Sequence, residues 1–184
     1  LGAPPLAGVH NLENAMCAGL MALSSGAAPE AVARAFASFK GVEHRLEYAG
    51  TLRGVRCIND SKATNVDSTV TALRALKSDA KNIWLIIGGQ DKGFPYSPLA
   101  PLVSKSVKKL LLIGEAATKI ESELGSSAAF EHAGTMEKAL ERCLAQAVPG
   151  DILLLSPACA SFDQFRDFEH RGAHFKKLVG GYGS

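Results

Sequence analysis

Three short apolar runs constrain the fold more than any other feature of this 184-residue sequence. They span Ile83–Ile87, Leu110–Ile113 and Ile152–Leu155, and no polar residue interrupts them. A strand that is apolar on both sides is typical of a parallel sheet whose two faces are covered by helices. Segments with apolar residues at helical spacing lie between the runs. The sequence therefore predicts an α/β fold with a Rossmann-like, mostly parallel sheet flanked by helices.

A hairpin is expected ahead of the first apolar run. Residues 45–49 and 55–59 each have strand character, and Arg53-Gly54 lies in the turn region between them. A short strand is also expected near residues 129–132.

The N-terminal segment differs from the rest of the chain. Residues 10–40 predict two helices, the second of which opens with Pro29, and no strand. We therefore expect a domain boundary, with a helical domain over residues 1–41 and the α/β domain over residues 42–184.

Composition argues against several classes of protein. No apolar run approaches the roughly 20 residues that span a bilayer, so no membrane partner is expected. The formal net charge is +2 with both signs interspersed, which argues against a nucleic-acid platform. Residues 1–5 lack the basic residue of a signal peptide and the initiator Met. We expect a fragment of a longer protein.

The cysteines and histidines predict no metal site. The four cysteines form no CxxC pair, which favours a reducing, cytoplasmic environment. His170 and His174 lie four apart on a predicted helix, but no HExxH pattern accompanies them.

The loop over residues 59–65 is the strongest candidate for a binding site. It follows a predicted strand, precedes a predicted helix, and offers a carboxylate, a lysine, two hydroxyls and two amides. Ligands of α/β sheets bind at the carboxyl ends of the strands, and helix-start amides favour anions. The alternative is a polar turn with a helix cap. A cap needs one such residue, so several around Lys62 favour a ligand site.

Two more polar loops follow apolar runs and should emerge along the same sheet edge. In residues 88–93, Gly88-Gly89 allows close backbone approach and Lys92 adds a cation, although the segment alone resembles a tight turn. In residues 156–161, Ser161 opens a Ser-Phe-Asp-Gln segment that matches the capping box. We expect Ser161 to cap the last helix and also to be able to meet a carboxylate.

Complete nucleotide machinery is not encoded in this sequence. It contains no GxGxxG fingerprint, no GxxxxGK[ST] P-loop and no GxSxG elbow. A nicotinamide enzyme is therefore disfavoured, and a full phosphoryl-transfer site is not expected.

Together these motifs resemble the Mur ligase family. The resemblance rests on residues 10–14, 44–45, 59–65, 88–92 and 156–165, which read HNLEN, HR, NDSKATN, GGQDK and SPACASFDQF. It covers essentially the whole chain but only the C-terminal part of such an enzyme, from the end of its ATP-binding central domain onwards. The UDP-binding domain, the P-loop and the Mg ligands have no counterpart here.

The resemblance implies an activity in peptidoglycan precursor synthesis. Within the family it is to the ligase that phosphorylates UDP-N-acetylmuramoyl-L-alanine with ATP, after which the amine of D-glutamate attacks the acyl phosphate. ATP and Mg are the implied cofactors, and a cytoplasmic monomer is implied.

The resemblance also implies roles on the nucleotide side. Asn11 and Asn14 are expected to contact adenine, and Asp60 to accept a ribose hydroxyl. Arg45 is expected to be a phosphate-side cation, both nucleotide-binding and catalytic. Lys62 is the second expected catalytic residue, near the reacting phosphate or carboxylates.

Four further residues are implied for the amino-acid substrate, namely Thr64, Lys92, Ser161 and Phe168. D-glutamate carries two carboxylates, which suit Lys, hydroxyl and helix-start amides together. Two alternatives stay open: a non-catalytic binding or interaction domain, and a sister ligase with another amino-acid substrate. The DNPR-type segment of the ligase that adds a diamino acid is not seen.

Overall fold

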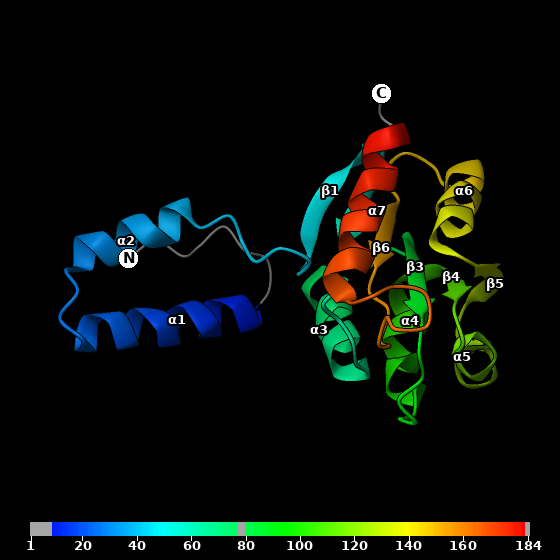
Figure 1. Ribbon diagram of the computed structural model, residues 1–184, viewed down its shortest axis with the longest axis horizontal. Coiled ribbons are helices and arrows are strands. Elements are labelled where there is room, and N and C mark those ends of the chain that lie inside the picture. The colour runs from blue at the N-terminus through cyan, green and yellow to red at the C-terminus, as the bar shows by residue number, and fades with distance from the viewer. Residues whose placement is uncertain (1–8, 77–79, 183–184) are drawn as a thin grey trace. The chain divides into compact units, whose positions relative to one another are not determined.

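Within residues 9–76 and 80–182, which the computed structural model describes, six strands form one sheet (Figure 1). They are β1 Glu47–Leu52, β2 Val55–Asn59, β3 Ile83–Gly88, β4 Val107–Ile113, β5 Ala129–Gly134 and β6 Ile152–Leu155. Their order across the sheet is β1-β2-β6-β3-β4-β5. β1 pairs antiparallel with β2, and every other pair is parallel. The predicted α/β class, hairpin and mostly parallel sheet are confirmed.

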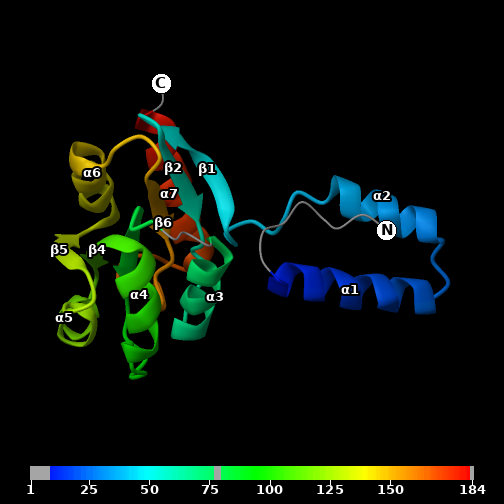
Figure 2. The same cartoon turned by 180° about the vertical axis from the view of Figure 1, so that it is seen from behind.

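Helices cover both faces of this sheet. The described helices are α1 Val9–Ser24, α2 Pro29–Ser38, α3 Val66–Leu76, α4 Ala100–Ser106, α5 Ala117–Leu124, α6 Met136–Gln146 and α7 Phe168–Tyr182, with a 3-10 turn, η1, at Ser97–Leu99. α6 and α7 pack on one face (Figure 1) and α3, α4 and α5 on the other (Figure 2). The prediction missed η1 and α4.

The two-sided burial explains why β3 is apolar throughout. Ile83, Leu85 and Ile87 pack in the core under α3, α4 and α5. Trp84 and Ile86 point to the opposite face and pack in the core under α6 and α7. Because successive side chains of a strand alternate between faces, each of the two cores needs apolar residues from the same run.

The chain divides into two compact units, between Val42 and Glu43. The first unit holds α1 and α2, which pack closely where Gly19 meets Phe36: a Cβ at Gly19 would lie 3.0 Å from the ring. Val32 of α2 is buried, whereas Ala35 and Phe39 are exposed. That this unit is the end of an ATP-binding domain stays a prediction.

Among the described residues, no helix has both the length and the apolar character that crossing a membrane requires.

Candidate functional site

Three polar loops meet at one edge of the sheet because β2, β6 and β3 are neighbours. Backbone hydrogen bonds join them: Asp60 N donates to Leu155 O at 2.8 Å, Gly88 N to Pro157 O at 2.9 Å, and Gln90 N to Ala160 O at 3.0 Å. The predicted convergence of residues 59–65, 88–93 and 156–161 is confirmed.

The backbone of Gly89 lies against the loop that follows β6. Its φ is +136°, and a Cβ at this position would collide with the carbonyl oxygen of Ala160. Glycine is therefore required here both for its backbone conformation and for the close approach of the two loops.

A buried arginine, Arg171 of α7, ties two of the loops together. Its side chain donates to Ser61 Oγ at 3.0 Å, Ser61 O at 2.9 Å, Ala160 O at 3.2 Å and, from both terminal nitrogens, to Cys159 O at 3.2 Å. The residue is 1% exposed. Burial lowers the pKa of Arg171 to about 10, so the guanidinium is still charged at neutral pH.

Sequence reasoning missed Arg171 because an arginine on a helix is usually solvated. One signal was present: Arg171 lies three residues after Phe168 and four before Phe175, within the stripe that α7 turns towards the sheet.

His44 fixes the segment that carries Arg45. It is 4% exposed, its Nδ1 lies 3.0 Å from Asn59 Nδ2, and its carbonyl accepts Lys62 N at 3.0 Å. A Cβ at Gly172 would collide with the His44 ring, so the segment and α7 are in close contact. Arg45 itself is exposed, which leaves its guanidinium accessible to a ligand.

Asp60 is more buried than a residue that only contacts a ligand would need to be. It is 5% exposed, Oδ1 accepts Leu46 N at 3.1 Å, and Oδ2 accepts Ser156 Oγ at 2.8 Å. Burial raises its pKa to about 6, against the lowering effect of Ser156, Leu46 N and Arg45. The carboxylate thus links the Arg45 segment to the loop after β6, and its predicted ribose contact stays a prediction.

Three of the four residues expected to bind the amino acid lie in two contacting pairs, one of which includes the expected catalytic residue Lys62. Lys92 Nζ donates to Thr64 O at 2.9 Å, and Lys62 Nζ lies 4.7 Å from the centroid of the Phe168 ring. Both lysines are exposed. Neither lysine forms an ion pair with a carboxylate of the described residues.

Ser161 lies at the same edge and is 2% exposed, but it does not cap the last helix. α7 begins only at Phe168, and Asp167 caps it by accepting His170 N at 2.6 Å. The hydroxyl of Ser161 forms no hydrogen bond with any described residue. The capping-box prediction was therefore wrong.

Tertiary contacts explain why the Ser-Phe-Asp-Gln segment does not start a helix. Gln164 Nε2 donates to Gly134 O at 2.7 Å, and Asp163 Oδ2 accepts Glu115 N at 3.2 Å. Of the two side chains that a capping box would use, that of Gln164 is thus engaged with the end of β5, and its neighbour Asp163 is engaged with the loop after β4.

A hollow of about 410 Å³ opens beside Lys92. Its walls are largely apolar, from Phe94, Tyr96 and Ala158, and Asp67 and Asp91 add carboxylates. Of the four residues expected to contact the amino acid, Lys92 alone lines it. We therefore locate the expected amino-acid contacts at the loop edge rather than within this hollow.

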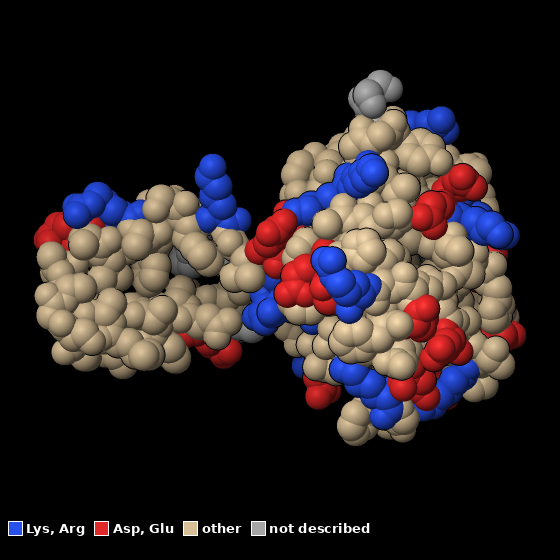
Figure 3. Space-filling model, viewed as in Figure 1, with Lys and Arg blue, Asp and Glu red and all other residues tan. Residues whose placement is uncertain are grey.

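Charges elsewhere on the second unit are mixed. Figure 3 shows basic and acidic side chains interspersed over the visible face. Glu43, His44 and Glu47 bring possible metal-ligand atoms within 4.8 Å of one another. Lys176 Nζ already pairs with Glu43 at 2.5 Å and Glu47 at 3.0 Å, so this cluster is an ion-pair network.

Asn11 and Asn14 lie on α1 of the first unit, half-buried and exposed respectively. Their role toward adenine stays a prediction.

A sequence family described as "Mur ligase, glutamate ligase domain" matches residues 44–159, more than half of the chain. The chain belongs to the Mur ligase family. The matched range begins at His44 and includes the loops after β2 and β3. It ends at Cys159, inside the loop after β6.

Relatives of this Mur ligase chain include two proteins named UDP-N-acetylmuramoylalanine–D-glutamate ligase. The protein from Elusimicrobium minutum (strain Pei191) is 53% identical over 175 residues, which cover 95% of this chain and 38% of the relative. The protein from Koribacter versatilis (strain Ellin345) is 49% identical over 174 residues, with the same two coverages. The chain thus spans 38% of the length of these relatives.

Solved structures of Mur ligases share the fold. The UDP-N-acetylmuramate-alanine ligase of Thermotoga maritima matches with a TM-score of 0.70 and 18% identity, over 97% of this chain and 39% of that one. The MurF ligase of Thermotoga maritima in complex with ADP matches with a TM-score of 0.64 and 15% identity, over 94% of this chain and 39% of that one.

Proposed function

We propose that this chain is the D-glutamate-binding, C-terminal portion of a cytoplasmic, monomeric UDP-N-acetylmuramoylalanine–D-glutamate ligase. The observation that carries the proposal is the grouping at one sheet edge of two exposed lysines, Lys62 and Lys92, with the Ser161 hydroxyl; among the described residues the lysines have no carboxylate partner and the hydroxyl has no hydrogen bond. D-glutamate presents two carboxylates to such a group. The names of the relatives at 53% and 49% identity support the same assignment.

In this proposal Lys92 and Ser161 hold a carboxylate of D-glutamate, and Thr64 supports Lys92. The carboxylate that they hold has the same charge before and during the reaction. Interactions of that kind lower the KM for D-glutamate more than they raise kcat. They also orient the amine towards the acyl phosphate, and orientation is a large part of catalysis between two substrates.

Lys62 has a second role in the proposal, near the groups that react. Its ammonium lies over the Phe168 ring, which restricts the lysine without neutralising it. An exposed, oriented cation can stabilise negative charge that develops on the acyl phosphate.

The residues fit the phosphates of a nucleotide, because Arg45 and Lys62 are exposed cations on adjoining segments. The ADP bound to the Thermotoga maritima relative agrees with nucleotide use in the family. ATP with Mg would supply the phosphoryl group, and we expect the Mg ligands outside this sequence. Asn11, Asn14 and Asp60 complete the proposed nucleotide contacts.

A chimeric enzyme tests the proposal. This chain replaces the corresponding C-terminal portion of the Elusimicrobium minutum relative, and ATP-dependent addition of D-glutamate to UDP-N-acetylmuramoyl-L-alanine is measured. We expect D-glutamate to be preferred over L-lysine and meso-diaminopimelate. Preference for another amino acid would support the sister-ligase alternative. A chimera that folds and binds no amino acid would support the non-catalytic alternative.

A further inference from the structure

Asp91 precedes Lys92 in the chain, and both side chains line the same hollow. A carboxylate beside a substrate-binding lysine is a problem for the proposed site, because it can pair with the lysine and compete with the carboxylate of the substrate. In the structure Asp91 does not do so. Its Oδ1 accepts Tyr96 Oη at 3.0 Å and Gly93 N at 3.2 Å, and its Oδ2 accepts Lys119 Nζ at 3.0 Å.

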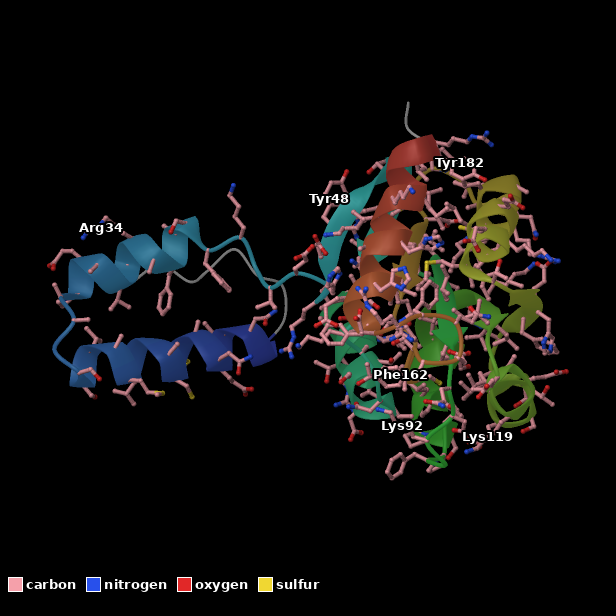
Figure 4. The ribbon with its side chains drawn as sticks, viewed as in Figure 1. Arg34, Tyr48, Lys92, Lys119, Phe162 and Tyr182 are labelled. Carbon is pink, nitrogen blue, oxygen red and sulfur yellow. The ribbon has the colours of Figure 1, made fainter. Side chains whose placement is uncertain are left out.

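Lys119 reaches Asp91 from α5, an element that sequence analysis did not connect with the site. Its ammonium also donates to Phe94 O at 3.0 Å and lies 5.4 Å from the centroid of the Tyr96 ring. Figure 4 shows Lys92 and Lys119 at the same end of the second unit, opposite the end where Tyr182 lies. Three groups of one loop thus hold the ammonium of Lys119.

The two lysines differ in their partners. Lys119 pairs with a carboxylate, whereas Lys92 donates to the neutral carbonyl of Thr64 at 2.9 Å. The ammonium of Lys92 is therefore not paired with Asp91 and is available to a ligand. The charge of Asp91 is held elsewhere: hydrogen bonds from Lys119, Tyr96 and Gly93 N keep its pKa below the usual value, although partial burial alone would raise it.

We propose that Lys119 is a positioning residue of the amino-acid site: by binding Asp91, it keeps the neighbouring Lys92 available for the substrate carboxylate. The inference rests on the proposed function, since it concerns the affinity for D-glutamate. Without Lys119, Asp91 keeps the hydrogen bonds from Tyr96 Oη and Gly93 N but loses its ion pair, and its uncompensated charge then competes with the substrate carboxylate for Lys92.

Removal of Lys119 should alter the charge around Asp91 more than the structure of the loop after β3, because a second contact holds this loop in place. Tyr96 is 2% exposed, and its hydroxyl lies 3.0 Å from Cys159 Sγ in the loop after β6. This contact joins the loop after β3 to the site independently of Lys119.

The test uses the chimeric ligase with Lys119→Met, Lys119→Arg, and Lys119→Met combined with Asp91→Asn. Lys119→Met should raise the KM for D-glutamate about two- to fivefold, the scale of one partly exposed ion pair, with kcat nearly unchanged. Lys119→Arg should retain the wild-type KM. The double variant should recover most of the lost affinity, because it removes the competing charge. Lys138→Met, at an exposed lysine of α6, serves as the control.

Two results would overturn the inference that Lys119 positions Lys92 through Asp91. A double variant as impaired as Lys119→Met would mean that Lys119 acts only through loop structure, and it would overturn the inference. An unchanged KM for Lys119→Met would overturn it as well. Failure of the proposed function would look different. In that case the wild-type chimera itself would not use D-glutamate, and both proposals would be refuted. Urea unfolding of each variant, followed by fluorescence, identifies variants that lose affinity by unfolding.

Discussion

Replacement of Arg171 by methionine should destabilise the second unit strongly. Methionine keeps most of the aliphatic packing of the stem but removes every donor of the guanidinium. Ser61 O and Cys159 O then have no other hydrogen-bond donor among the described residues, and both residues are buried. Ala160 O keeps one bond, from Gln90 N at 3.0 Å.

The magnitude follows from the two orphaned carbonyls. A buried acceptor left without its donor costs about 1–3 kcal/mol, so two of them cost about 2–6 kcal/mol. Release of a buried charge offsets part of this cost. We therefore expect the free energy of unfolding to fall by about 2–4 kcal/mol, which is a large fraction of the stability of a typical domain.

Urea unfolding can measure this loss in the second unit alone. The chain has a single tryptophan, Trp84 on β3, which is 2% exposed, so its fluorescence reports that unit. Lys177→Met, at an exposed position of the same helix, is the control and should change stability by less than about 0.5 kcal/mol. If Arg171→Met unfolds at the wild-type midpoint with the wild-type slope, the guanidinium does not hold the loops together.

Three further variants test other parts of the site. In the chimeric ligase, Lys92→Ala should raise the KM for D-glutamate about tenfold or more, as expected for a charged hydrogen bond, whereas Lys81→Ala at an exposed position should not. Ser161→Ala should also raise that KM, yet it should change the free energy of unfolding by less than about 0.5 kcal/mol because no helix is capped. A loss of about 0.5–2 kcal/mol would instead indicate a cap. Because burial raises the pKa of Asp60 in the folded protein to about 6, above the ordinary value of 3.8, its contribution to stability should be present at low pH and fall as the pH rises. Between pH 4.5 and 7, wild type should therefore lose about 2 kcal/mol relative to Asp60→Asn in urea unfolding, and a constant difference would contradict the raised pKa.

Residues buried on both faces of the sheet made the strands predictable. Ile83–Ile87 and Ile152–Leu155 are apolar because they supply residues to both cores, and such an uninterrupted apolar run can be recognised in the sequence alone. The convergence of the three loops followed from the parallel arrangement. The position of β6 between β2 and β3 did not, because no periodicity encodes which strand is the neighbour of which.

Local motifs failed where tertiary contacts compete for the same side chains. Ser161 and Gln164 have capping-box spacing, but Gln164 is used by Gly134 O and the helix starts later. α4 was missed because two prolines suggested a loop. Pro98 lies in η1, just before α4, and Pro101 lies in the first turn of α4, where proline is accepted. Lys119 and Arg171 contact residues of the site loops from α5 and α7, where a charged residue normally faces water.

The place of β6 in the sheet has a consequence for how the chain is made. β6 is synthesised after the other five described strands, yet it is the one that joins β1-β2 to β3-β4-β5. Until residues 152–155 emerge, the nascent chain carries two half-sheets whose inner edges, β2 and the wholly apolar β3, are unpaired. Such edges readily pair with other chains. The sheet is therefore completed after synthesis of most of the chain, by contacts between distant residues, which is the slow kind of folding step. A ribosome that stalls before residue 152 would release an aggregation-prone intermediate rather than a smaller domain.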